Sequence, residues 1–215
     1  AGAALIKISP LAREIIRAAR RGAPQLPISV KTRLGYHRDE LETWLPTLLE
    51  TEVSAITLHA RTRQEMSKVP ARWGRIKEAV RIRDEMKKKT LIIGNGDVLD
   101  LVEAKCRANE TGVDGVMLGR AIFGHPELFK FKGETSEPQD LTLEQIKRKL
   151  SILTEHTKLF EELLGEVKSF ALMKKHFKAY LTGSVRAGEL RVELMTAADP
   201  ASAGRMIAKY LATVV

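Results

Sequence analysis

Apolar residues recur along this chain in two rhythms. Short apolar runs of strand type alternate with stretches whose apolar residues return every three or four positions, the spacing of one helix face. Strands are predicted at residues 27–34, 54–59, 90–93 and 113–118, and helices at residues 9–22, 39–50, 73–89 and 100–110. This alternation predicts an α/β fold with a parallel sheet or barrel, buried on both faces. A closed (β/α)8 barrel needs eight strands, so the predicted strands would make half of one.

The pattern changes after residue 131. Residues 132–140 (KGETSEPQD) are polar and are interpreted as a linker. Beyond the linker no strand pattern occurs, and Thr142 with Gln145 predicts a capping box at the start of a long helix. Further helices are predicted at residues 167–181, 187–195 and 200–213. We therefore expect a partial barrel at residues 1–131, a linker at 132–140 and a small all-α helical bundle at 141–215.

Two glycine-containing turns follow the third and fourth predicted strands. The first is Gly94-Asn95-Gly96-Asp97, and the second is Gly119-Arg120. Glycine lets the backbone approach a phosphate closely, and free N–H groups at a turn point at an anion. In a (β/α)8 barrel the loops after the last two strands build such a site. The turns predict a phosphate-bearing cofactor, with Arg120 as a charged donor and Asp97 capping the next helix or orienting the loop.

Charge and cysteine content narrow the class of protein. Lys and Arg total 36 against 27 Asp and Glu, a net charge of +9, which favours a polyanionic partner such as nucleic acid or serves solubility alone. No apolar run of about 18 residues is present, so no membrane span is expected. The single cysteine, Cys106, excludes an intrachain disulfide and fits a reducing compartment. Without an initiator methionine or secretory signal, the chain is interpreted as internal to a longer protein.

Several segments, taken in order, resemble one known family. They are SVKTRLG at residues 29–35, TLHARTR at 57–63, IIGNGDV at 92–98 and TGVDGVMLGRAIFGHPELF at 111–129. Together with the opening AGAALIKISPLAREIIRA and the tail segments LTLEQIKRKL and FALMKKHFKAYLTG, they are similar to the second half of a tRNA-dihydrouridine synthase. The resemblance covers nearly the whole chain, although the family usually has glycine where Ala60 stands.

This resemblance implies strands 5–8 of an FMN-binding TIM barrel followed by a helical tRNA-binding domain. The implied reaction is reduction of the C5–C6 double bond of a uridine in tRNA, with NADPH reducing bound FMN and hydride passing to C6. The family's proton-donating cysteine lies in a loop upstream of Ala1, so no catalytic residue is assigned here. The chain alone is therefore expected to be inactive. Cys106 lies within a predicted helix and is interpreted as structural or incidental.

The resemblance also implies the site residues. Those expected to hold the cofactor are Lys31, His59, Asn95, Gly96, Asp97, Gly119 and Arg120. Lys31 would lie at the pyrimidine edge of the flavin, where a fixed cation stabilises the negative charge of the reduced ring. Those expected to contact tRNA are Arg61, Arg63, Lys174, Lys175 and Lys178. On the residues alone, Lys31 could be an edge lysine that reaches water, His59 a structural group and the basic side chains a solvated surface.

Two other functions are compatible with the sequence. One is a non-catalytic RNA-binding protein. The other is a different FMN barrel oxidoreductase, of the dihydroorotate dehydrogenase type, against which the basic helical tail argues. For the favoured function we expect tRNA as the partner, no membrane, no metal, a monomer and a cytoplasmic location. The uridine that is modified does not follow from one sequence.

Overall fold

The chain forms two compact units, Ala1–Gly119 and Arg120–Val215, in a computed structural model that describes residues 2–130, 141–184 and 187–214. The predicted linker at residues 132–140 lies outside the described residues. The division between the units falls at Gly119, ahead of the domain boundary expected at residue 131. Each unit has an apolar core of its own.

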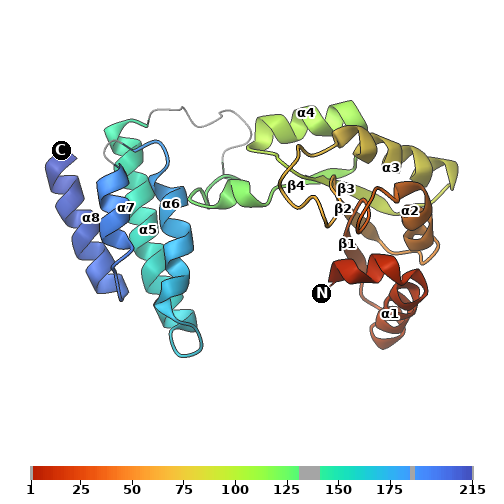
Figure 1. The fold of residues 1–215 in the computed structure, drawn as a ribbon, viewed down its shortest axis with the longest axis horizontal. Helices are drawn as coiled ribbons and strands as arrows, with labels where there is room; N and C mark the ends of the chain where they lie inside the picture. The colour runs from red at the N-terminus through yellow and green to blue at the C-terminus, as the bar shows by residue number, and fades with distance from the viewer. Residues whose placement is uncertain (1, 131–140, 185–186, 215) are drawn as a thin grey trace. The chain divides into compact units, whose positions relative to one another are not determined.

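A parallel sheet forms the frame of the first unit (Figure 1). Its strands are β1 (Ser29–Arg33), β2 (Ala55–His59), β3 (Leu91–Asn95) and β4 (Gly115–Met117), paired in the order β1-β2-β3-β4. Each strand lies next to the one that follows it in the chain, as consecutive strands do in a (β/α)8 barrel. Four parallel strands with intervening helices confirm the predicted α/β fold class.

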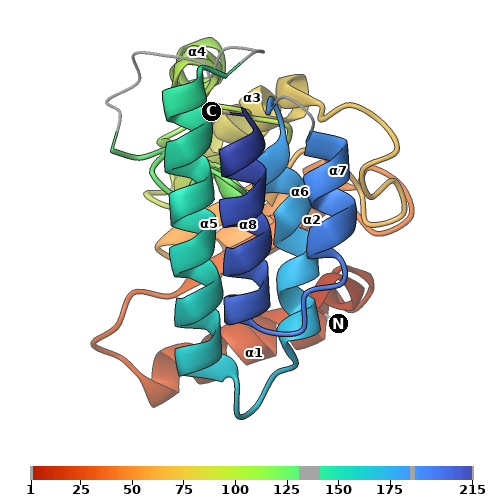
Figure 2. The same cartoon turned by 90° about the vertical axis from the view of Figure 1, so that its left-hand side faces the viewer.

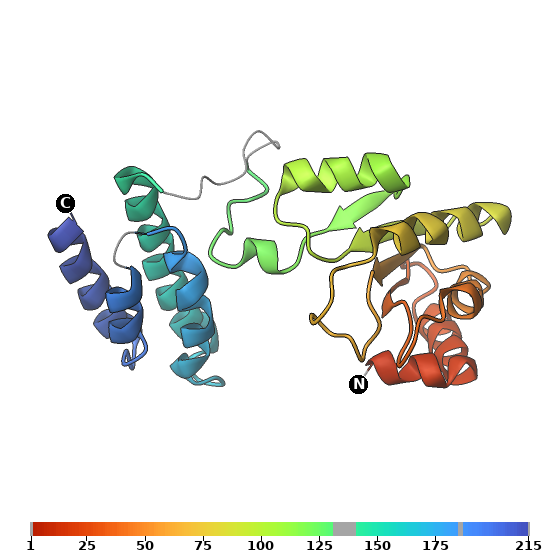
Figure 3. The same cartoon turned by 45° about the horizontal axis from the view of Figure 1, so that its top comes forward.

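Helices connect the strands and pack against one face of the sheet (Figures 1 and 3). A 3-10 helix, η1 (Gly2–Lys7), leads into α1 (Ser9–Gly22), and α2 (Leu41–Leu49), α3 (Trp73–Glu85) and α4 (Leu101–Thr111) follow β1, β2 and β3. The core joins Ile56, Leu58 and Ile92 of the strands, each 0% exposed, to apolar residues of all four α-helices. Because strand side chains alternate between faces, the residues between these ones point away from the helices.

Polar side chains collect on that opposite face of the sheet. Arg33, His59 and Asn95 are register partners across β1, β2 and β3, and each is the last residue of its strand. Lys31 lies two residues before Arg33, so its side chain points to the same face. The carboxyl ends of parallel strands lie at one edge of a sheet. The alternation therefore gathers these polar groups where barrel enzymes carry their active sites.

The second unit is a helical bundle. It contains η2 (Arg120–Ile122), α5 (Leu143–Leu164), η3 (Phe170–Met173), α6 (Lys174–Leu181), α7 (Ala187–Leu194) and α8 (Pro200–Val214). The α-helices stand side by side, with α5 against α6 and α8, and α7 against the same two (Figure 2). Thr142 and Gln145 form the predicted capping box. The single helix predicted at residues 167–181 is divided instead, because the Ser169 side chain accepts the N–H of Ala171 and begins η3.

Residues 120–130 belong to the bundle rather than to the sheet. Gly124 has a φ of 76°, and a Cβ at this position would lie 2.4 Å from the carbonyl carbon of Ala179 in α6. Only glycine permits that approach. Nearby, Glu127 accepts hydrogen bonds from Nε and Nη2 of Arg148 in α5, both at 2.7 Å. These contacts explain why the division between the units precedes the polar linker.

Candidate functional site

Two side chains and a backbone carbonyl form a line across the carboxyl ends of the strands. Nζ of Lys31 in β1 donates to Oδ1 of Asn95 in β3 at 3.3 Å. Nδ2 of Asn95 donates to the carbonyl of Met117 in β4 at 2.7 Å. Both ends of the amide are engaged, which fixes its orientation. Since Met117 lies just before Gly119, Asn95 connects the first glycine turn to the strand that leads into the second.

His59 ends β2 among positive charges. Burial, followed by the charges of Arg33, Lys31 and Arg61, lowers the pKa of His59 from 6.5 to about 4, while Asp97 acts in the opposite direction. The imidazole is therefore neutral near pH 7. Nη1 of Arg61 lies 3.3 Å from Nε2 of His59. Because arginine only donates, Nε2 must accept, which assigns the ring proton to Nδ1.

Arg61 joins the loop after β2 to the loop after β3. The residue is 3% exposed. Its Nε donates to the carbonyl of Val69 at 2.6 Å, and its Nη2 donates to Oδ2 of Asp97. The same Asp97 oxygen accepts the N–H of Ala71 at 2.9 Å. The Arg61 guanidinium, which was expected to contact RNA, thus donates its hydrogen bonds to groups of the protein instead.

The turn after β3 is held by the first residue of α3. Gly96 has a φ of 132°, and its carbonyl accepts a hydrogen bond from Nε1 of Trp73 at 2.9 Å. The indole also lies against Gly94, where a Cβ would be 2.5 Å from Cζ3 of Trp73. Trp73 was not among the predicted site residues, and its place shortly after a polar loop was the only signal of this role. Of the two roles expected for Asp97, the structure shows loop orientation, because Asp100 caps α4.

Two further arginines add positive charge to this edge. Burial, followed by the charges of Arg61 and Arg63, lowers the pKa of Arg33. Arg33 was absent from the predicted site, although its spacing of two residues from Lys31 would have placed it on the same face. Arg63 is exposed, and its guanidinium carbon lies 6.0 Å from the centroid of the Tyr36 ring. An exposed cation stacked on an aromatic ring suits contact with a polyanion.

Gly119 and Arg120 follow β4, on either side of the division between the units. Among the described residues, no atom comes within 4 Å of the position that a Cβ of Gly119 would take. Arg120 is the first residue of η2. An open glycine backbone is one that a phosphate oxygen can approach.

Cys106 lies on α4, on the helix-covered side of the sheet. It is exposed, and its Sγ donates to Oε1 of Glu110 at 3.4 Å. The bond to Glu110, with the charge of that carboxylate, raises the pKa of the Cys106 thiol. A protonated thiol is a weak nucleophile, so nothing in its surroundings activates this cysteine.

The basic residues predicted to contact RNA in the tail lie on α6. Lys175 and Lys178 are exposed and Lys174 is half-buried. Across the described parts of the bundle, no carboxylate forms an ion pair with any of these three lysines. Their charges therefore remain available to an external anion.

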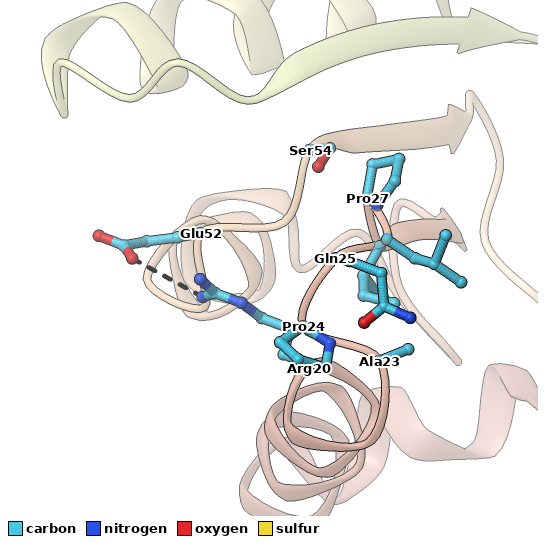
Figure 4. Close-up of a pocket in the computed structure, with 9 residues that line it drawn as sticks. Arg20, Ala23, Pro24, Gln25, Pro27, Glu52 and Ser54 are labelled. Carbon is cyan, nitrogen blue, oxygen red and sulfur yellow. Dashed lines mark ion pairs between the residues drawn. The ribbon is translucent and has the colours of Figure 1, made fainter.

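A polar cavity of about 460 Å³ lies at the other edge of the sheet, where β1 and β2 begin (Figure 4). Arg20 projects into it, with Nη1 donating to the Thr51 carbonyl at 2.7 Å and 3.7 Å from Oε2 of Glu52. Ser54, immediately before β2, forms part of the opposite wall. The amino-terminal edge of a barrel serves stability rather than catalysis, and the cation here is already paired. This cavity therefore stands apart from the candidate site.

Within residues 2–130, 141–184 and 187–214, no group of three or more His, Cys, Asp or Glu side chains is arranged to hold a metal ion. In the same ranges, no helix has both the length and the apolar composition of a membrane span.

Comparison with known proteins gives consistent matches. A family model described as dihydrouridine synthase matches residues 1–214. A probable tRNA-dihydrouridine synthase of Staphylococcus aureus (strain MRSA252) is 38% identical over 211 residues, which cover 97% of this chain and 61% of that protein. A probable tRNA-dihydrouridine synthase 2 of Bacillus subtilis (strain 168) is 40% identical over 196 residues, which cover 90% of this chain and 57% of that protein. The chain thus spans about three fifths of the length of these relatives.

Proposed function

Because the chain belongs to the dihydrouridine synthase family, we propose that it forms the flavin-binding and tRNA-binding part of an enzyme that reduces the C5–C6 double bond of a uridine in tRNA. The observation that carries this proposal is the line from Lys31 through Asn95 to the Met117 carbonyl, beside the neutral ring of His59. In this arrangement a cation and fixed hydrogen-bonding groups lie at the same edge of the sheet as the glycine turns. We propose the cytoplasm as its location.

FMN is the proposed cofactor, and NADPH the proposed electron donor. When bound, FMN supplies the hydride that reduces the uracil ring. Asn95, Gly96, Gly119 and Arg120 would hold its phosphate, and the open backbone at Gly119 supports this role. The one carboxylate in the first turn, Asp97, is satisfied by protein donors and so does not present a bare charge to an anion.

Lys31 and His59 would meet the flavin ring and the base. Lys31 is exposed near the strand end, and partial burial, followed by the charge of Arg33, lowers its pKa. A cation that Asn95 holds in place can stabilise a negative charge that develops beside it. The neutral imidazole, with its proton on Nδ1, can offer a hydrogen bond without adding charge. Lys31 would therefore supply the electrostatic stabilisation and His59 the orientation.

Contacts with tRNA are proposed for Arg63 and for Lys174, Lys175 and Lys178. Cations of this kind bind the phosphate backbone and give salt-dependent affinity with little sequence preference. Arg61 is proposed instead to hold the loops, since its guanidinium is buried. A uridine inside folded tRNA must leave its stack to reach the sheet edge.

Replacement of Lys31 tests the catalytic part of the proposal. The complete enzyme, of which this chain is the proposed part, is incubated with FMN, NADPH and an unmodified tRNA transcript, and dihydrouridine is measured by mass spectrometry. Lys31→Met should lower the rate by about 100-fold, the scale of losing one preorganised charge or donor. Lys77→Met, at an exposed lysine of α3, is the matched control and should keep the rate.

The unsubstituted complete protein distinguishes the rival functions. If that protein binds tRNA but forms no dihydrouridine with FMN and NADPH, the non-catalytic RNA-binding function is favoured. Flavin-dependent turnover of a small molecule such as dihydroorotate, without tRNA binding, would favour the third function. A Lys31→Met rate equal to that of Lys77→Met would remove the assigned role of Lys31.

The RNA surface has its own test. Lys174→Ala together with Lys175→Ala should weaken tRNA binding and reduce the slope of log affinity against log salt, because fewer counterions are released. The double variant Lys77→Ala with Lys89→Ala removes two exposed lysines of the first unit and serves as the control. If both pairs change the slope equally, α6 is not the RNA surface.

A further inference from the structure

The helical unit contains a cavity of about 520 Å³ between α5, α6 and the segment after η2. Its lining includes Phe123, Ile152, His156, Leu159, His176 and Tyr180. This volume lies in the range of small-molecule sites, and the walls are mainly apolar and aromatic, as such sites usually are. The cavity lies wholly within the second unit.

Aromatic rings form a connected chain along this cavity. The ring centroids of Phe123 and His176 are 5.5 Å apart, and those of His176 and His156 are 5.3 Å apart. Tyr180 continues the chain at 5.9 Å from His156. Phe123 is 52% exposed, so its ring is accessible to a ligand. The free ring faces offer a platform on which a planar heterocycle can stack.

Two polar groups of the lining, His156 and Glu127, carry little free charge. Nδ1 of His156 lies 3.0 Å from the Tyr180 hydroxyl, and burial, followed by the charge of His176, lowers the pKa of His156. Glu127 is paired with Arg148 and with Lys130, whose bonds hold the pKa of that carboxyl at about 2. Its negative charge is thus balanced by two cations. The cavity suits a neutral planar ring better than an ion.

Basic residues lie close to this aromatic cavity in sequence. On α6, the exposed Lys175 immediately precedes His176, whereas the exposed Lys178, two residues beyond His176, lies toward the opposite face of the helix. Lys130 is part of the lining, where it pairs with Glu127. A ligand that fits this combination carries a planar base and flanking phosphates. Unstacked bases of single-stranded RNA segments are recognised in this way, by aromatic side chains and basic neighbours.

We propose that this cavity receives one unstacked nucleobase of the RNA, at a position distinct from the uridine that is reduced. The proposal rests on the proposed function, which supplies tRNA as the partner. Glu155, an exposed carboxylate of the lining, can accept from an exocyclic amino group. The cavity would therefore favour a base that carries an amino group over uracil.

Removing a ring without removing apolar volume tests the proposal. Phe123→Leu and His176→Leu are compared with the unsubstituted protein for binding of an unmodified tRNA transcript over a series of KCl concentrations. Each should lower affinity by about tenfold at every salt concentration, because stacking releases no counterions. Leu163→Ala, at an exposed apolar residue of α5 outside the lining, is the control and should change nothing. Circular dichroism verifies that each variant keeps its helices.

A chemical footprint identifies the base. In the complex with the unsubstituted protein, one base in a loop of the transcript should be protected on its Watson–Crick edge, and Phe123→Leu should restore its reactivity. Unchanged affinity and an unchanged footprint in both ring variants, with tRNA still bound, would overturn the proposed role of the cavity. The proposed function of the protein would not be affected. A change confined to the salt slope would also overturn the role of the cavity, since that indicates a phosphate contact. Failure of the unsubstituted protein to bind tRNA would instead remove the proposed partner, and the cavity assignment with it.

Discussion

Arg61 donates through Nη2 to Oδ2 of Asp97, across the gap between the loops that follow β2 and β3. The two residues come from separate strand-helix connections and neither belongs to a strand. The pair is largely removed from water on the arginine side, where the side chain is 4% exposed, and partly open on the aspartate side, at 35%. The position of one loop thus depends on the other, and His59 lies against the same guanidinium.

Loss of Arg61 should destabilise the first unit. Arg61→Leu removes the charged donor to Asp97 and the side-chain donor to the Val69 carbonyl, and we expect the free energy of unfolding to fall by about 2–4 kcal/mol, as when one partner of a mostly buried pair is removed. Arg63→Leu, at an exposed neighbour, should stay within about 0.5 kcal/mol. Urea denaturation measures both. Equal midpoints for the two variants would show that the buried contacts contribute little.

The charge of His59 should be independent of pH across the neutral range. Its pKa in the folded state is about 4, below the 6.5 of the free side chain. The unfolded state therefore binds the proton first on acidification, so the stability linked to His59 is complete above pH 6.5 and is lost as pH falls through about 4. An NMR titration of the imidazole protons should show a midpoint near 4. A midpoint near 6.5 would mean that burial and the surrounding cations are ineffective.

Gly94 should not tolerate a methyl group. A Cβ there would overlap the Trp73 ring, and overpacking of this kind costs about 1–3 kcal/mol. Gly94→Ala should accordingly lower the midpoint of thermal unfolding. Gly74→Ala, on α3 with no described atom within 4 Å of the new Cβ, should instead be neutral or stabilising by up to about 1 kcal/mol. Similar effects from both substitutions would contradict the packing of Trp73 on the strand.

A substitution at Gly119 should affect ligand binding without affecting stability. Because a Cβ at this position meets no described atom, Gly119→Ala should leave the unfolding midpoint nearly unchanged. If the turn approaches a phosphate, the methyl group should weaken FMN binding by about tenfold, which quenching of flavin fluorescence can measure. Riboflavin, which lacks the phosphate, is the ligand control and should bind both forms alike. Equal loss for both ligands would place the methyl group against the ring instead.

The strands and the location of the site could be predicted from the sequence because they follow from local patterns. The alternation through Lys31 and the turn at Asn95 depend on residues that are neighbours in the chain, so period and turn chemistry reveal them. The family resemblance added the residue roles, which stay predictions. Arg33 obeys the same period as Lys31, so that period would also have placed it at the site.

The long-range contacts that hold the loops of the site in place could not be predicted in this way. Arg61 looked like one of several basic residues, and its burial depends on Asp97, which is 36 residues later in the chain. Trp73 contacts Gly96 across 23 residues. Contacts at such separations depend on how the strands pair, which local propensity does not encode. The break before α6 was missed for a different reason, since a serine cap competes with a helix pattern that is otherwise continuous.

The two apolar cores have a consequence for melting. Leu58 belongs to one cluster of buried residues and Leu150 to the other. Cooperativity arises where side chains share packing, so sheet and bundle should lose their order in separate thermal transitions. Calorimetry should resolve two peaks, and Leu150→Ala should shift only one of them. A single melting temperature would then describe neither half of the chain, and damage to one half could leave the other intact.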